Sequence, residues 1–277
     1  MRRSRVLEKL RAGKPALLTS ITLGPSTLAV EIVGRAGLDG VWIDMEHRPL
    51  SQREVAEMIN AARVVDTDAM VRIRKGEGYT SFFRPFEDGA AGIMVPHIKS
   101  REEAEWVILN AKYPPLGRRG CDTFMPDADL GFSDPLAYLE HANRETFVVA
   151  QIEDAEALEH LDEIASVPGL DVLFIGPADL SISLGVPFQL DSSRYCEAVQ
   201  AIRKAAERHG KWWGLVVGDV ATAAVYAQQG ARFLCIGGDI FFLRAACLAL
   251  RRDFDQAMAA VKFTTSADPM EVNHPSG

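Results

Sequence analysis

The chain has 277 residues, of which 48% are hydrophobic and 25% charged, so it is long enough for one large α/β domain or two small ones and can bury a sizeable core. Its net charge of −8 argues against a nucleic-acid binder, because proteins that track phosphates concentrate Lys and Arg on one face. No run of about 18 apolar residues predicts a membrane span, and too few apolar residues follow Arg2, Arg3 and Arg5 for a signal peptide, so we expect a cytoplasmic protein.

Short apolar runs alternate with longer helix-patterned stretches along most of the chain. The runs predict strands over residues 16–21, 40–43, 69–73, 92–95, 147–152, 172–175, 212–216 and 233–236. Helical periodicity between them covers residues 52–63, 101–112, 155–166, 195–209 and 221–229. The strand runs are apolar throughout, as expected for a parallel sheet that is covered on both faces.

This order of strands and helices predicts a closed parallel (β/α)₈ barrel, a TIM barrel formed by a single domain. The alternative is a doubly wound open sheet, which needs a Gly-rich phosphate loop after its first strand. Residues 22–26 read Thr-Leu-Gly-Pro-Ser and lack that spacing, so the barrel is favoured. We expect it to span residues 1–263, with a polar tail over 264–277 that is disordered or lies on a neighbouring subunit. The long connection over 113–143 is expected to be functional or tightly packed.

Reactive side chains follow the second and third predicted strands, and strand ends are where the active site of such a barrel lies. Asp44, Glu46 and His47 come after the second strand, and Arg72 ends the third. Asp44 can orient His47 as a general base, or these residues can simply form a polar loop with a helix cap. Arg72 can pair with a surface acid, or its guanidinium can bind a carboxylate or enolate oxygen.

Carboxylates follow the fifth and sixth predicted strands. Glu153 comes directly after residues 147–152, and Asp179 closes the segment Gly176-Pro177-Ala178-Asp179. Each acid alone can be a helix cap. Together on one rim, without Cys or His beside them, they predict a hard oxygen-donor site for Mg²⁺ or Mn²⁺.

Several motifs in this order resemble one known family. They are Asp44-x-Glu46-His47, Val71-Arg72, Tyr113-Pro114-Pro115-x-Gly117-x-Arg119-Gly120, Gln151-Ile152-Glu153, and Phe-Ile-Gly-Pro-Ala-Asp-Leu-Ser over residues 174–181. Across residues 5–255 the chain resembles the HpcH/HpaI class II pyruvate aldolases. These are barrels of the phosphoenolpyruvate/pyruvate type and include 4-hydroxy-2-oxoheptanedioate aldolase, 2-keto-3-deoxy-sugar-acid aldolases and macrophomate synthase.

The resemblance implies a role for each matched position. His47 would be the general base, with Asp44 holding its imidazole, and Arg72 would stabilise the enolate. Glu153 and Asp179 would bind a divalent metal, Mg²⁺, Mn²⁺ or Co²⁺. The substrate-binding positions would be Gln151, Gly176, Pro177 and Ala178. The implied reaction is reversible aldol cleavage of a 4-hydroxy-2-keto acid into an aldehyde and pyruvate, or a related keto acid such as hydroxypyruvate.

The resemblance also implies a homohexamer, a trimer of dimers in which the last helix, over residues 240–251, packs on a partner barrel. Three positions depart from the commonest family pattern. Met45 replaces a frequent Gly, Glu87 stands where Asp is common, and His97 stands where many members have Met. These departures leave the core chemistry in place and the aldehyde specificity open.

Three other functions fit parts of the pattern. A Schiff-base aldolase needs a desolvated lysine, and the candidates Lys75 and Lys99 have charged neighbours in the sequence. A lyase of the citrate-lyase, malyl-CoA-lyase or macrophomate-synthase type would share the barrel and the metal. A catalytically silent metabolite-binding barrel is expected to lack part of the His, Arg, Glu and Asp set, and none of these is missing here.

Overall fold

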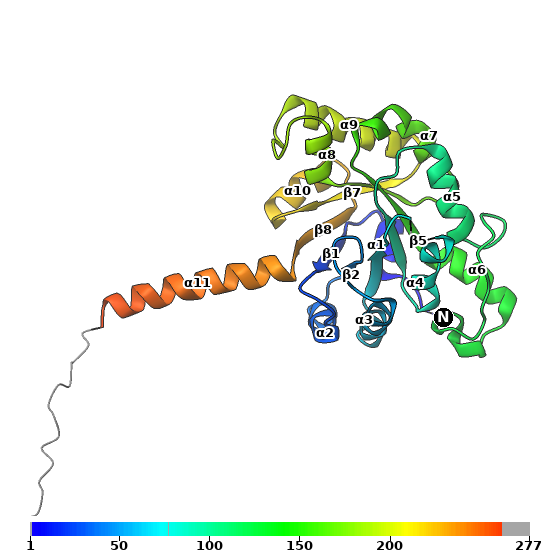
Figure 1. The fold of residues 1–277 in the computed structure, drawn as a ribbon, viewed down its shortest axis with the longest axis horizontal. Helices are drawn as coiled ribbons and strands as arrows, with labels where there is room; N and C mark the ends of the chain where they lie inside the picture. Colours follow the sequence, from blue (N-terminus) through cyan, green and yellow to red (C-terminus); the bar gives the residue numbers. More distant parts are fainter. Residues whose placement is uncertain (1, 77, 262–277) are drawn as a thin grey trace, which may run out of the picture. The chain divides into compact units, whose positions relative to one another are not determined.

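Eight parallel strands close into a barrel in the order β1-β2-β3-β4-β5-β6-β7-β8, in a computed structural model that describes residues 2–76 and 78–261 (Figure 1). The strands are β1 (Ala16–Ile21), β2 (Gly40–Asp44), β3 (Asp68–Arg72), β4 (Gly92–Val95), β5 (Phe147–Ile152), β6 (Val172–Ile175), β7 (Trp212–Val217) and β8 (Phe233–Gly238). The predicted (β/α)₈ fold is confirmed. The tail predicted over 264–277 lies outside the described residues.

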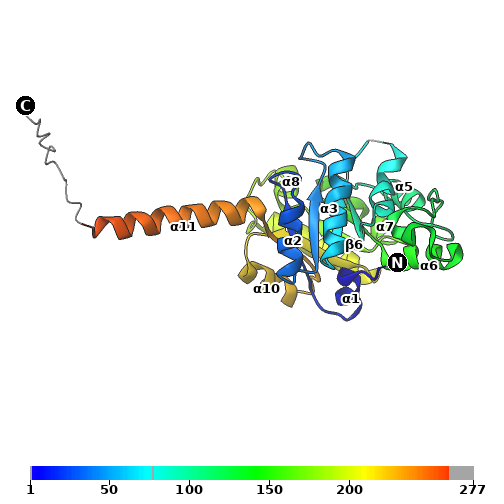
Figure 2. The ribbon, with the colours of Figure 1, turned by 90° about the horizontal axis from the view of Figure 1, so that it is seen from below.

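Helices α1 to α10 lie around this barrel (Figures 1 and 2). The α-helices are α1 (Arg5–Arg11), α2 (Thr27–Arg35), α3 (Gln52–Val64), α4 (Arg84–Glu87), α5 (Arg101–Ala111), α6 (Pro135–Glu145), α7 (Leu161–Ala165), α8 (Pro177–Ser183), α9 (Ser193–Arg208) and α10 (Val220–Gln228). Short 3₁₀ helices are η1 (Tyr79–Phe82), η2 (Pro126–Gly131) and η3 (Ala155–His160). The final helix, α11 (Asp239–Ala259), runs mostly in a second unit that begins at residue 241. None of the described helices is long and apolar enough to cross a membrane.

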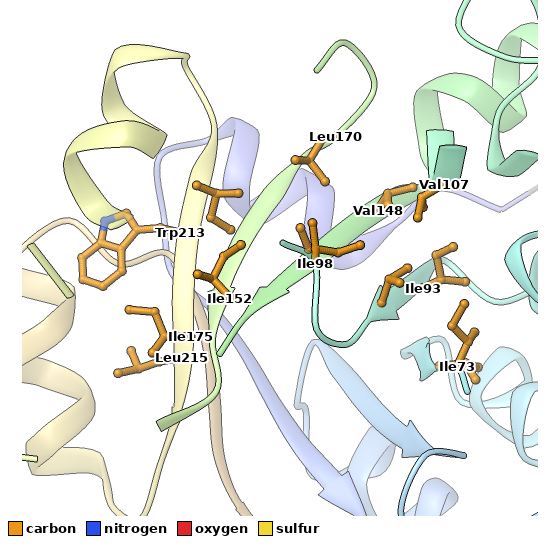
Figure 3. Packing of buried hydrophobic residues seen from close by; sticks show 14 of the residues in the cluster. Ile73, Ile93, Ile98, Val107, Val148, Ile152, Leu170, Ile175, Trp213 and Leu215 are labelled. Carbon is orange, nitrogen blue, oxygen red and sulfur yellow. The ribbon is translucent and has the colours of Figure 1, made fainter. Parts of the chain in front are cut away.

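Two apolar layers hold the barrel together. One fills its interior, where Trp42, Met70 and Phe174 pack with Leu7 and Leu10 of α1. The other lies between the strands and the surrounding helices, and Figure 3 shows part of it, with Ile152, Ile175 and Leu215 on neighbouring strands. Successive side chains on a strand point to opposite faces, which explains why uniformly apolar runs supply both layers.

The amino-terminal end of the barrel is closed by the first residues of the chain. The Asp68 carboxylate, at the start of β3, accepts hydrogen bonds from Ser4 Oγ (2.6 Å) and the Val6 N–H (2.9 Å) and pairs with Arg2 at 2.5 Å. Burial raises the pKa of Asp68, although the Arg2 charge and these hydrogen bonds oppose the shift. Ser4 also caps α1, a helix that the sequence analysis did not predict.

The long connection over 113–143 is mostly exposed and packs through only a few buried side chains, and it runs into α6, which its Pro- and Gly-rich composition did not reveal. Buried Arg119 pairs with Asp127 at 2.8 Å and lies over the Tyr113 ring at 4.7 Å. The Tyr113 and Tyr138 hydroxyls are 2.8 Å apart and share a hydrogen bond. Asp134 caps α6, so local capping rather than periodicity starts this helix.

Candidate active site

An ion pair between β2 and β3 forms the centre of the polar ring at the carboxyl ends of the strands. Arg72 Nε and Nη2 donate to the two Asp44 oxygens, each at 2.9 Å, from paired positions at the ends of these strands. Both side chains are buried, with 7% and 4% exposed. Burial raises the pKa of Asp44, but the hydrogen bond and charge of Arg72 outweigh it, so the net shift is downward. The pair therefore stays ionised.

The predicted contact between Asp44 and the His47 imidazole is wrong. Asp44 Oδ1 instead accepts the backbone N–H groups of Glu46 (3.0 Å) and His47 (3.4 Å). These bonds hold the turn after β2 and turn the carboxylate toward Arg72. The His47 side chain is 58% exposed, and its Nε2 lies 3.8 Å from Glu46 Oε2. The structure thus places His47 at the rim with Glu46, not Asp44, beside its ring.

Glu46 lies between Arg72 and a second histidine, His97, and no role was predicted for it from the sequence. Its Oε2 is 2.9 Å from Arg72 Nη1, and its Oε1 is 3.6 Å from His97 Nε2. The sequence could have indicated a role for Glu46, because this residue follows a strand end in the same motif as Asp44 and His47. Only the tertiary structure shows that it spans the gap between the Arg72 guanidinium and a second histidine.

Gln151 connects the arginine to the buried carboxylate that follows β5. Its Oε1 lies 3.5 Å from Arg72 Nη1, and its Nε2 donates to Glu153 Oε2 at 2.6 Å. Glu153 Oε1 accepts the backbone N–H of His97 at 2.9 Å. Residues from β2, β3, β5 and the turn after β4 therefore form one continuous polar network.

His97 is held as the second histidine of this network. Its Nδ1 lies 2.9 Å from Asp154 Oδ2, and its backbone adopts a positive φ of 54°. Burial lowers the pKa of the imidazole, but the hydrogen bond to Asp154 and the charges of Glu153, Asp154 and Glu46 outweigh it and raise the pKa. Asp154, next to Glu153 in the sequence, was not predicted as a site residue.

Glu153 and Asp179 fit the metal-binding role that the sequence predicts for them. Burial, together with the charges of Glu46 and Asp179, raises the pKa of Glu153 to about 7, although the His97 N–H and charge oppose the shift. A buried carboxylate beside two others is an environment that a cation would stabilise. Within residues 2–76 and 78–261 no three His, Cys, Asp or Glu side chains form a complete metal site. Two carboxylates would leave positions open for water and substrate oxygens.

Gly176 is required for this arrangement. A Cβ at this position would lie 2.3 Å from Glu153 Oε2 and 2.9 Å from Gln151 Nε2. The residue precedes α8, which starts at Pro177 and places Asp179 in its first turn rather than at the cap. The first N–H groups of a helix have no partner within it, so the amides of Ala178 and Asp179 can bind an anion, whereas Pro177 has no N–H.

The two candidate Schiff-base lysines are solvated cations in ion pairs. Lys75 Nζ lies 3.0 Å from Glu103 Oε1, and Lys99 Nζ lies 3.6 Å from Asp154 and 3.5 Å from Glu156. The charge of Asp154 raises the pKa of Lys99. A Schiff-base nucleophile needs the opposite, a desolvated lysine with a lowered pKa.

Trp42 lies beneath the ring and was not predicted as part of it. Arg72 Cζ is 4.7 Å from the centroid of the indole, which packs edge-on against Phe174 at 5.8 Å. Trp42 precedes Asp44 by two residues on the same strand, so both side chains point to the same face of the sheet. The alternation of side chains along a strand could therefore have predicted that Trp42 lies near Asp44. The guanidinium is thus held by Asp44 at its edge and by the indole at its face.

Comparison with known proteins gives a consistent result. The profile of the HpcH/HpaI aldolase/citrate lyase family matches residues 22–246. The hydroxypyruvate/pyruvate aldolase of Paraburkholderia phytofirmans is 32% identical over 251 residues, which cover 88% of this chain and 95% of the relative. The 4-hydroxy-2-oxo-heptane-1,7-dioate aldolase of Escherichia coli is 30% identical over 253 residues, covering 91% and 95%. An HpcH/HpaI aldolase structure from Desulfitobacterium hafniense DCB-2 aligns with a TM-score of 0.82 and 29% identity, covering 95% and 98%.

Proposed function

The chain belongs to the HpcH/HpaI aldolase/citrate lyase family, and on that basis we propose that it is a class II, divalent-metal-dependent aldolase. Its proposed reaction is reversible cleavage of a 4-hydroxy-2-keto acid into an aldehyde and pyruvate or a close 2-keto acid such as hydroxypyruvate. The observation that carries the proposal is the network in which Arg72 is fixed between Asp44 and Gln151, with Glu153 at the far end. The Arg72 guanidinium and the carboxylates of Glu153 and Asp179 thus lie at the same end of the barrel, the carboxyl ends of the strands.

Each group has a proposed part in this reaction. Glu153 and Asp179 would hold Mg²⁺, Mn²⁺ or Co²⁺, which as a Lewis acid acidifies the keto-acid methyl group. Arg72 donates to the oxygen on which negative charge develops, since Asp44 and Glu46 occupy only part of its five N–H donors. Gln151 lies beside the keto acid, and the Ala178 and Asp179 amides bind its carboxylate. His47, exposed at the rim, takes the methyl proton.

Proton exchange tests this proposal without knowledge of the aldehyde. With divalent metal and no acceptor, the enzyme is expected to exchange the methyl protons of pyruvate with D₂O, followed by proton NMR. His47→Ala should slow exchange by about a hundredfold, within the range for a positioned general base, and leave pyruvate and metal binding intact. His160→Ala, which removes another exposed histidine, is the matched control and should exchange at the wild-type rate.

Two results would change the interpretation. A wild-type enzyme that binds pyruvate and metal but leaves the methyl signal unchanged over hours would contradict the enolate mechanism and favour a silent binding barrel. Unchanged exchange in His47→Ala would retain the aldolase but place the base elsewhere, with His97 the next group to test.

We further propose that the enzyme is a cytoplasmic homohexamer, a trimer of dimers in which α11 packs on a partner barrel. No described residue of α11 is buried, and Phe241, Phe242 and Leu243 are more than half exposed. Such a run of exposed apolar side chains is typical of an interface. Light scattering at micromolar concentration is expected to show the hexamer. Phe241→Asp with Leu243→Asp should shift the mass downward, and a monomeric wild type would refute the proposal.

A further inference from the structure

A cavity of about 690 Å³ lies at the amino-terminal ends of the strands, opposite the candidate active site. Three of its lining residues mark this position. Asp68 is the first residue of β3, Ala91 directly precedes β4, and Thr146 directly precedes β5. The carboxyl ends of the same strands carry the polar ring, so the barrel itself separates the two places. Nothing in the proposed aldolase reaction uses this cavity.

The carboxylates that line the cavity already have cationic partners. Asp68 pairs with Arg2 at 2.5 Å, and Asp127 pairs with Arg119 at 2.8 Å. Glu145 is 3.1 Å from Arg11 and 3.3 Å from Arg144. Each of these acids therefore has a cationic partner, although Asp127 Oδ1 is buried without a hydrogen-bond partner.

Arg3 and Arg63 also line the cavity, and neither forms an ion pair within residues 2–76 and 78–261. Arg63 makes only long bonds to neutral groups, with Asn60 Oδ1 and the Pro126 carbonyl both at 3.3 Å. The Arg63 side chain packs closely on Gly89, where a Cβ would lie 2.8 Å from Arg63 Cδ. Two guanidinium groups without a carboxylate thus face one concave surface, in a chain whose net charge is −8.

We propose that this cavity is a second binding site, for a small organic dianion. A guanidinium binds the oxygens of a carboxylate or a phosphate through two parallel N–H donors. A dicarboxylate and a phosphate ester can therefore both bind to the two arginines. The small apolar side chains of Ala90, Ala91 and Ala142 provide a surface for the carbon body of the ligand. The volume lies within the range of known small-molecule sites.

Titration calorimetry at constant ionic strength tests the site, with glutarate and glycerol 3-phosphate as the two probes. At least one probe is expected to bind the wild-type enzyme saturably in the millimolar range or tighter. Arg63→Gln and Arg3→Gln should each weaken that binding about tenfold, the scale of one lost charged hydrogen bond. Arg101→Gln, which removes an exposed arginine on α5, is the matched control and should bind as the wild type does. Which probe binds identifies the ligand as a dicarboxylate or a phosphate ester.

A variant of the candidate active site separates the two locations. Arg72→Ala should retain the binding, because Arg72 lies at the opposite ends of the strands. Two results would overturn the proposal. One is saturable binding that is lost in Arg72→Ala and is unchanged in both Arg3→Gln and Arg63→Gln. The other is the absence of saturable binding of either probe up to tens of millimolar. Arg3 is exposed and makes no described hydrogen bond, so Arg3→Gln remains informative if Arg63→Gln fails to fold.

Discussion

Removal of divalent metal is expected to abolish turnover, and Mg²⁺, Mn²⁺ or Co²⁺ should restore it. The physical reason is the pair Glu153 and Asp179 on one rim, where burial and the charges of Glu46 and Asp179 raise the pKa of Glu153 in the absence of a cation. Lewis-acid stabilisation is worth several kcal/mol, and each ~1.4 kcal/mol is a factor of ten, so Glu153→Gln should lower kcat by about a thousandfold or more. Steady-state assay of pyruvate release after chelation and metal addition measures both effects.

The matched control is Glu156→Gln, the same change three residues later at an exposed carboxylate that pairs with Lys99. It should turn over like the wild type and show the same dependence on metal. Borohydride with pyruvate should leave the wild type active, since Lys75 and Lys99 are solvated ion-pair partners. Full activity in excess chelator, or a pyruvate adduct on either lysine, would contradict the class II assignment.

Arg72→Ala should reduce turnover by about a hundredfold or more, the scale seen when one donor to a developing oxyanion is lost. The structure adds a second effect. Asp44 would remain buried without its partner, and breaking a buried ion pair destabilises a protein by about 3–5 kcal/mol. Thermal unfolding and steady-state kinetics of the same preparation separate the two losses.

The double variant Arg72→Ala with Asp44→Asn distinguishes charge donation from structural support. The amide oxygen that Asp44→Asn introduces can still accept the backbone N–H groups of the turn after β2, but the substitution leaves no buried charge at position 44. The double variant should therefore recover much of the lost stability and none of the lost turnover. Recovery of turnover along with stability, or near-normal turnover in Arg72→Ala, would reduce Arg72 to a structural residue.

The sequence alone predicted the barrel and the rim at which its polar residues gather, although it gave no site role to Glu46, Asp154 or Trp42. Uniformly apolar runs at regular spacing predicted the eight strands, and those over 16–21, 92–95, 147–152 and 172–175 coincide with β1, β4, β5 and β6. The carboxyl ends of parallel strands meet at one rim, so residues that follow separate strands had to converge there. Arg72 at the end of β3 meets Gln151 and Glu153 at the end of β5 in one hydrogen-bonded network.

Only the tertiary structure decided which of these groups pair. The motif suggested that Asp44 holds His47, yet Asp44 binds Arg72, because the register of β2 and β3 places the two side by side at the strand ends. In the same way, the turn after β4 presents the His97 N–H to Glu153. Sequence periodicity reports which face of an element is buried. Contacts between residues far apart in the chain depend on register and side-chain direction, which a local pattern does not encode.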